Sequence, residues 1–225
     1  MNILIIGFQR SGTTLLRRLL QLHPQVRRVF HESFFLAKTK DKQTLIQHVE
    51  RMGVNTEKDN WGEKCPYYPN LKKIPIFKYC DIWNRYFGDK SRILHIVRHP
   101  YDCALSNVKK FKHIPSVDNP LNLYRRSVSP SVVKVSKMKS AFTFKYEDMV
   151  LDSDRMMFDI YKHCGLKPDI NYRKKMRAIK NSVYQKIDMS RAFNYKDQNK
   201  KWETFDLQDS IDIINETVGG SEYEL

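Results

Sequence analysis

The sequence of 225 residues predicts an α/β domain of three layers, with helices flanking a central, mostly parallel sheet. Short apolar runs alternate along the chain with segments of helical periodicity. Two of these runs, residues 2–6 and 92–97, lead through a short polar loop into a helix. The length suits one core, so we expect a single domain over residues 1–225, with about 205–225 forming a tail or terminal helix.

The elements of the first half follow from apolar spacing. Residues 2–6 are β-type, residues 7–12 form a polar loop, and residues 13–22 carry leucines at the spacing of one buried helix face. His23-Pro24 ends that helix, because proline disfavours helical geometry in the residue before it. We expect a second strand over 26–30, an exposed helix over 41–52, a loop over 55–70 and a helix over 74–87.

In the second half, residues 92–97 form the clearest buried strand, followed by Arg98-His99-Pro100 and a helix over about 101–110. Another strand is expected over 141–145, then Tyr146-Glu147-Asp148 and a helix near 153–164. The remainder is rich in Lys, Arg and Asn, and we expect it to form a basic flank over the site. In parallel sheets of this kind ligands bind at the carboxyl ends of the strands, where these loops begin.

Charge is the unusual feature of the composition. Forty basic and 25 acidic residues give a formal charge of +15, which favours anionic partners such as nucleotide cofactors, nucleic acid, acidic glycans or acidic peptides. The four cysteines have no spacing typical of zinc ligands, so we expect buried thiols and no metal site. Without a signal peptide or an apolar run of roughly 18 residues, the expectation is a soluble, cytoplasmic protein.

Residues 7–14 (Gly-Phe-Gln-Arg-Ser-Gly-Thr-Thr) have the composition of an anion-binding loop. Loop amides and the amino end of the following helix point to one place, and the helix dipole favours negative charge there. Arg10 adds a cation, and Ser11, Thr13 and Thr14 add hydroxyl donors. The alternative is a glycine turn without a ligand, but the strand–loop–helix context favours a binding site.

One residue separates this loop from that of the nucleotide triphosphatases, Gly-x-x-x-x-Gly-Lys-Ser/Thr. Thr13 stands where the lysine is expected, which argues against an ATPase or a kinase. The segment instead resembles the 5′-phosphosulfate loop of sulfotransferases, in which the cation lies two residues before the second glycine, here at Arg10. This resemblance implies a P-loop-like version of the three-layer fold.

A second segment resembles the sulfotransferase motif for a 3′-phosphate. That motif is an apolar strand, then Arg-Asp-Pro, then a serine eight residues after the arginine; here Arg98 and Ser106 hold those positions and His99 replaces the aspartate. A guanidinium fork and a hydroxyl suit phosphate oxygens. The alternative for Arg98 alone is a strand-end arginine in a salt bridge.

Weaker likenesses extend over roughly residues 2–205. Glu63-Lys64-Cys65-Pro66 resembles a Glu-Lys-x-Pro segment whose lysine approaches the transferring group, the alternative being a surface-loop lysine. Glu147 and Asp148 are expected to hold local structure, and Arg191 and Trp202 belong to a loosely matched basic region. The cofactor-binding residues that the resemblance implies are Arg10, Ser11, Gly12, Thr13, Thr14, Arg98, Ser106, Tyr146, Ser182 and Lys201.

The resemblance implies transfer of a sulfuryl group from 3′-phosphoadenosine 5′-phosphosulfate to a hydroxyl or amine, without a metal and with adenosine 3′,5′-bisphosphate as product. Arg10 and Lys64 are the candidates for stabilising charge, and Glu32 is the candidate base. Because neighbouring side chains of an extended segment point opposite ways, we expect only one of His31 and Glu32 to face the acceptor. His99 and His113 are weaker candidates, and Glu32 could instead pair with Arg27 or Arg28.

Two other functions stay open at this point. A small-molecule or nucleotide kinase would share the loop, and a nucleic-acid-binding protein would share the charge, although no nucleic-acid-binding signature occurs and no such partner is expected. The acceptor is equally open. An acidic glycan or a peptide tyrosine suits the charge, and a small alcohol is a further choice.

Overall fold

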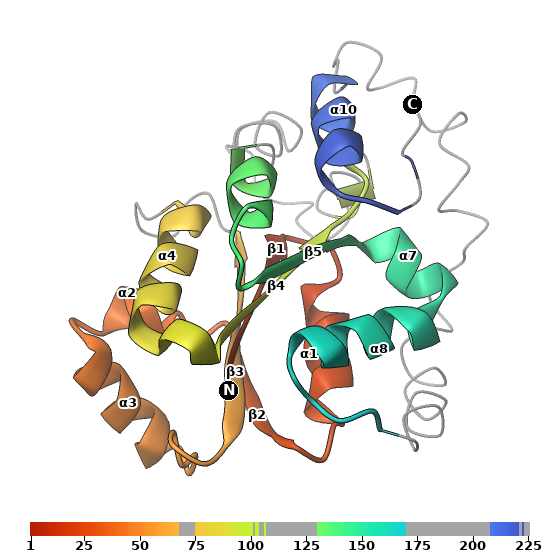
Figure 1. Cartoon of the computed structure of the whole chain (residues 1–225). Helices are drawn as coiled ribbons and strands as arrows, with labels where there is room; N and C mark the ends of the chain where they lie inside the picture. The colour runs from red at the N-terminus through yellow and green to blue at the C-terminus, as the bar shows by residue number, and fades with distance from the viewer. Residues whose placement is uncertain are drawn as a thin grey trace.

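The computed structural model describes residues 1–67, 75–100, 102, 103, 106, 130–169, 208–220 and 222. Within these residues five strands form one parallel sheet in the order β2-β3-β1-β4-β5 (Figure 1). The strands are β1 (Asn2–Phe8), β2 (Val26–His31), β3 (Asn60–Tyr67), β4 (Ser91–Val97) and β5 (Ala141–Lys145). The predicted α/β class and parallel sheet are confirmed.

Helices cover both faces of this sheet (Figure 1). One layer consists of α1 (Thr13–Gln21), α7 (Tyr146–Leu151) and α8 (Ser153–His163), which enclose a core with Ile3, Ile5 and Leu94. The other consists of α2 (Phe35–Lys38), α3 (Lys42–Arg51), α4 (Ile76–Phe87), helical residues 130–136 and α10 (Gln208–Thr217), around Leu4, Ile6 and Ile93. A short 3-10 turn, η1 (Gly88–Lys90), precedes β4. Alternate side chains of β1 therefore enter two cores, as in a sheet covered on both faces.

Strand β3 contradicts the prediction of a loop over residues 55–70. Its sequence contains Glu63, Lys64 and Pro66, which are unusual in a central strand, yet every residue after Asn60 is buried. Gly62 allows the close approach to β1, because a Cβ there would lie 2.2 Å from the Ile3 carbonyl oxygen. The two charged side chains are tolerated because each is hydrogen-bonded inside the protein.

The other expected elements largely occur where the pattern placed them. The strands at 2–6, 26–30, 92–97 and 141–145 and the helices at 13–22, 41–52, 74–87 and 153–164 end within about two residues of the observed bounds. The helix over about 101–110 falls partly within the described residues, and those at 102, 103 and 106 are helical. The four cysteines are buried and free, as expected. Among the helices that the structure describes, none is both long and apolar enough to cross a membrane.

Candidate active site

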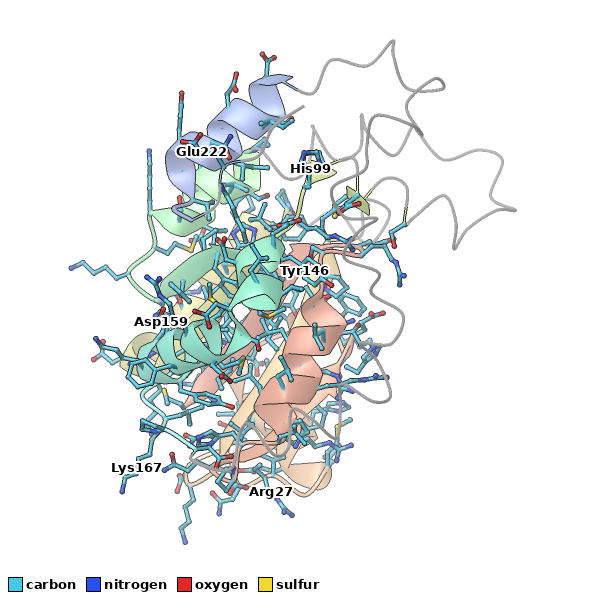
Figure 2. All side chains as sticks on the ribbon, turned by 90° about the vertical axis from the view of Figure 1, so that its right-hand side faces the viewer. Arg27, His99, Tyr146, Asp159, Lys167 and Glu222 are labelled. Atoms are coloured by element: carbon cyan, nitrogen blue, oxygen red, sulfur yellow. The ribbon has the colours of Figure 1, made fainter. Side chains whose placement is uncertain are left out.

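The strand order creates a switch point at the carboxyl end of β1. From β1 the chain passes over β3 to reach β2, returns to β3, and then crosses to β4 on the other side of β1. Connections that leave in opposite directions open a crevice at that end of the sheet, where ligands bind in α/β proteins. Tyr146 and His99 lie at this end, whereas Arg27 and Lys167 lie at the other end of the sheet (Figure 2).

The loop between β1 and α1 has the geometry of an anion site. Gly12 is the residue before α1 and has φ of 100°, and a Cβ there would lie 2.4 Å from the Tyr146 ring. Among the described residues, no side chain caps the amino end of α1, so its first amides are available to a ligand. Ser11 is fully buried, and its Oγ has no hydrogen-bond partner in the described part of the chain. An anion placed here would meet unused donors.

Arg98 and Ser106, from the second sequence motif, both contact Arg10 of this loop. Arg98 Nη1 donates to the Arg10 carbonyl oxygen at 3.1 Å, and Arg10 Nε donates to Ser106 Oγ at 2.8 Å. The Arg98 guanidinium lies 4.6 Å from the centroid of the Tyr146 ring. Arg98 also pairs with Asp102 at 3.1 Å, so the salt bridge considered as an alternative exists alongside the loop contacts. Burial opposes the Arg98 charge, but Asp102 and other neighbours hold its pKa above the ordinary value.

Lys64 is a buried cation beside the same loop. It leaves the central strand β3, is 2% exposed, and donates from Nζ to Thr14 Oγ1 at 3.1 Å and to Glu32 Oε1 at 2.5 Å. The surface-loop alternative for Lys64 is therefore wrong. Its ammonium group joins the start of α1 to the candidate base at the end of β2.

The prediction that only one of His31 and Glu32 faces the site is wrong. His31 Nε2 lies 3.4 Å from Lys64 Nζ, and the Glu32 carboxylate contacts the same ammonium group. The reason is local: β2 ends at His31, and Glu32 has φ of 53°, so the alternation of an extended strand no longer applies. Burial and the nearby Lys64 lower the pKa of His31, although Glu32 raises it.

Neither arginine considered as a partner of Glu32 provides the ion pair seen here. Arg27 lies near the start of β2, at the opposite end of the sheet (Figure 2). Arg28 Nη1 donates to the Met52 carbonyl oxygen at 3.2 Å. His99 is buried, and its backbone N–H donates to Glu147 Oε1 at 3.1 Å, in line with a local structural role for Glu147.

The three candidate catalytic residues fall into two groups. Lys64 and Glu32 contact each other, whereas the Arg10 side chain reaches Ser106. Ser182, Arg191, Lys201, Trp202 and His113 lie outside the described residues. In the part of the chain that is described, no group of three or more His, Cys, Asp or Glu side chains could hold a metal ion.

The sequence assigned no role to two residues next to this site, Glu63 and Arg17. Glu63 is buried on the opposite face of β3 from Lys64, and Tyr79 on α4 donates to its carboxylate. Arg17 on α1 is partly buried and contributes to the lowered pKa of His31. A recognised strand at 60–67 would have indicated Glu63, because adjacent strand residues face opposite sides.

The chain is similar to known sulfotransferases. A family model described as the sulfotransferase domain matches residues 1–216, and no curated protein matches the chain. Among solved structures, the sulfotransferase domain of the Synechococcus PCC 7002 olefin synthase is 17% identical, with a TM-score of 0.55 over 76% of each chain. A sulfotransferase from Alicyclobacillus acidocaldarius is 16% identical, with a TM-score of 0.53 over 80% of this chain and 91% of the other.

A mouse sulfotransferase complexed with PAP is similar as well. It is 18% identical, with a TM-score of 0.52 over 77% of this chain and 61% of the mouse chain. The present chain thus spans less than two thirds of that protein's length. At such identities the likeness to solved structures concerns the fold.

Proposed function

Because the chain belongs to the sulfotransferase domain family of enzymes, we propose that it transfers a sulfuryl group from 3′-phosphoadenosine 5′-phosphosulfate to an acceptor hydroxyl or amine. The observation that carries this proposal is the junction of two anion-binding motifs. Arg10 belongs to the first loop, yet its Nε donates to Ser106 Oγ of the second motif at 2.8 Å. A cofactor with a 5′-phosphosulfate and a 3′-phosphate needs two such sites side by side.

The residues present fit that cofactor. Ser11 Oγ and the start of α1, which have no side-chain partner within the described part of the chain, offer donors for the 5′ group, with Thr13 and Thr14 next in the chain. The cradle that a Cβ on Gly12 would fill is bounded by the Tyr146 ring. We assign Ser11, Gly12, Thr13 and Thr14 to the phosphosulfate, Arg98 and Ser106 to the 3′-phosphate, and Tyr146 to the adenosine part, with Ser182 and Lys201 as further predicted contacts.

When bound, the cofactor supplies an activated sulfuryl group and a phosphate leaving group. Lys64 contributes a desolvated ammonium beside Thr14, where positive charge is most effective because water is excluded. Arg10 contributes a second cation at the junction of the two anion sites. Fixed cations and amides that need no reorganisation provide the charge stabilisation that this transfer requires.

Glu32 takes the acceptor proton in this proposal. Its carboxylate is partly exposed and lies next to Lys64, so an acceptor entering beside it approaches both the base and the cation. His31 is the second candidate base, since its half-exposed ring faces the same ammonium and its lowered pKa keeps the imidazole neutral. Transfer by a Glu32→Gln variant separates the two.

The acceptor is proposed to be acidic: an anionic glycan or a peptide tyrosine flanked by acidic residues, in preference to a small neutral alcohol. The formal charge of +15 supports this choice. Locally, Lys64 and Arg17 contribute two positive charges near His31 against the one negative charge of Glu32, so the acceptor end of the site has a net positive charge. Arg17 Nη1 donates to the Val29 carbonyl oxygen at 3.1 Å, and its Nε is buried with no hydrogen-bond partner among the described residues.

The test is transfer of labelled sulfate from the cofactor to a panel of acidic glycans, tyrosine peptides and small alcohols. We expect Arg98→Ala to weaken cofactor binding and Glu32→Gln to lower kcat by roughly 100-fold or more with cofactor affinity retained. Exposed Arg51→Ala and Glu57→Gln serve as charge-matched controls. Undiminished transfer by Glu32→Gln removes Glu32 as the base, and failure to bind the cofactor at all contradicts the proposed function.

A further inference from the structure

A buried carboxylate lies behind the Lys64–Glu32 pair, on the other face of β3. Glu63 is fully buried; its Oε1 accepts from the Phe35 N–H at 3.0 Å, and its Oε2 accepts from the Tyr79 hydroxyl at 2.8 Å. The Tyr79 hydroxyl oxygen in turn accepts from the Leu36 N–H at 3.2 Å. Glu63 and Tyr79 therefore act together on consecutive backbone amides.

Those amides are the first two of α2, which begins three residues after Glu32. Amides in the first turn of a helix have no partner within the helix, and α2 has only four residues with which to stabilise itself. An ionisable group is costly to bury unless hydrogen bonds compensate it. The Glu63 carboxylate meets both needs at once, because it satisfies the start of α2 and is satisfied by it.

The turn between β2 and α2 depends on this anchor. Glu32 has φ of 53° and Phe34 has φ of 51°, a left-handed conformation that non-glycine residues adopt only when their surroundings impose it. The Glu32 N–H donates to the Lys64 carbonyl oxygen at 2.9 Å, which fixes one end of the turn to β3. The hydrogen bond from Phe35 to Glu63 fixes the other end to the preceding residue of the same strand.

We propose that Glu63 is a positioning residue, which holds the amino end of α2 and thereby aims the Glu32 carboxylate at Lys64 and His31. The role is exerted through the backbone, since the Glu63 side chain lies among α2 and α4 and not among the groups assigned to the cofactor. The inference rests on the proposed role of Glu32 as the base. Strand β3 thus has two roles in this proposal. Lys64 faces the site, and its neighbour Glu63 positions Glu32, which contacts Lys64.

The pKa of His31 reports the position of the Glu32 carboxylate without the need for an acceptor. Its charged neighbours are Lys64 and Arg17, which lower its pKa, and Glu32, which raises it. If Glu63 orients Glu32, then in Glu63→Leu the Glu32 carboxylate moves away from His31. The pKa of His31 should then fall as much as it does in Glu32→Gln. Glu63→Gln keeps a carbonyl oxygen for the Phe35 N–H, so the His31 pKa stays close to that of the wild type.

The measurement is an NMR titration of the histidine ring protons, with His31→Asn to assign the resonance among the seven histidines. His163 is the internal control, because its lowered pKa arises from burial and from groups other than Glu32. Its titration should be unchanged in every variant. A folded Glu63→Leu protein with the wild-type His31 pKa overturns the proposal.

A gentler variant keeps the proposal testable if Glu63→Leu does not fold. Tyr79→Phe removes one donor to Glu63 and the acceptor of the Leu36 N–H, and we expect the His31 pKa to fall by part of the Glu32→Gln effect. An unchanged His31 pKa in folded Tyr79→Phe then overturns it. Full transfer activity in Glu32→Gln would refute the base assignment alone, since the titration still reports where Glu32 points.

Discussion

Glu63 gives the protein a dependence of stability on pH whose size follows from its burial. Burial raises the Glu63 pKa from 4.5 to about 7, against the opposing effect of the hydrogen bonds from Tyr79 and from the Phe35 and Phe34 backbone. Between these values the folded chain holds a proton that the unfolded chain releases, so the free energy of unfolding falls as pH rises. At 1.36 kcal/mol per pKa unit, the contribution of Glu63 to the free energy of unfolding should fall by about 3 kcal/mol across this window.

Urea unfolding of the wild-type protein and of Glu63→Gln, over about pH 4 to 8, measures this loss. The difference between the two proteins isolates Glu63 from other titrating groups. We expect wild-type stability, relative to Glu63→Gln, to fall by about 3 kcal/mol as pH rises. Exposed Glu57→Gln should show no such change relative to the wild type. A constant difference between wild type and Glu63→Gln would refute the reasoning.

Three further predictions concern β4 and the anion site. Burial lowers the pKa of His95 to about 3, so the stability of the wild type relative to His95→Gln should fall as pH drops below about 6.5, where His95 of the unfolded chain takes up a proton; the same urea series measures this difference. Gly12→Ala places a Cβ 2.4 Å from the Tyr146 ring and should lower the affinity for adenosine 3′,5′-bisphosphate by about tenfold or more in calorimetry. Gly53→Ala is its matched control, because Gly53 also has positive φ but open space around it, and retained affinity in Gly12→Ala would contradict the predicted cradle. Arg98→Lys keeps the charge but loses the fork, so binding of the bisphosphate should weaken by about tenfold while that of adenosine 5′-monophosphate stays unchanged.

The parts of the fold that the sequence predicted are those with uniform local patterns. The strands at 2–6, 92–97 and 141–145 are short apolar runs, each followed by a polar segment. The leucines of 13–22 have the spacing of one helix face. Their local preference agrees with their place in the sheet, so the pattern alone is sufficient.

Strand β3 could not be recognised in this way. Glu63 and Lys64 read as loop residues because their stabilising partners lie far away in the sequence, Phe35 28 positions before Glu63 and Thr14 50 positions before Lys64. Only the folded sheet brings these groups together. Tertiary contacts thus override a local pattern that argues against a strand.

The orientation of Glu32, the candidate base, could not be predicted from the alternation of side chains along a strand either. Alternation along an extended segment separates His31 from Glu32, but the left-handed backbone at Glu32 places both beside Lys64. That conformation is imposed by contacts with β3 and not by the residues themselves. The two motifs around Arg10 and Arg98 needed no such information, because each is contiguous in the sequence.

The sequence alone left more than one function open. The loop at 7–14 and the charge of +15 left a kinase and a nucleic-acid-binding protein open, and the family match over residues 1–216 identifies a sulfotransferase domain. The acceptor, the base and the contacts of Ser182 and Lys201 stay predictions.

The cofactor assignment is tested most directly by isothermal titration calorimetry with adenosine 3′,5′-bisphosphate and, in parallel, adenosine 5′-monophosphate. The two ligands differ only in the phosphate assigned to Arg98 and Ser106. We expect the bisphosphate to bind at least about tenfold more tightly, a difference of about 1.4 kcal/mol that disappears in Arg98→Ala. Equal affinities in the wild-type protein, or no binding of either nucleotide, would contradict the assignment.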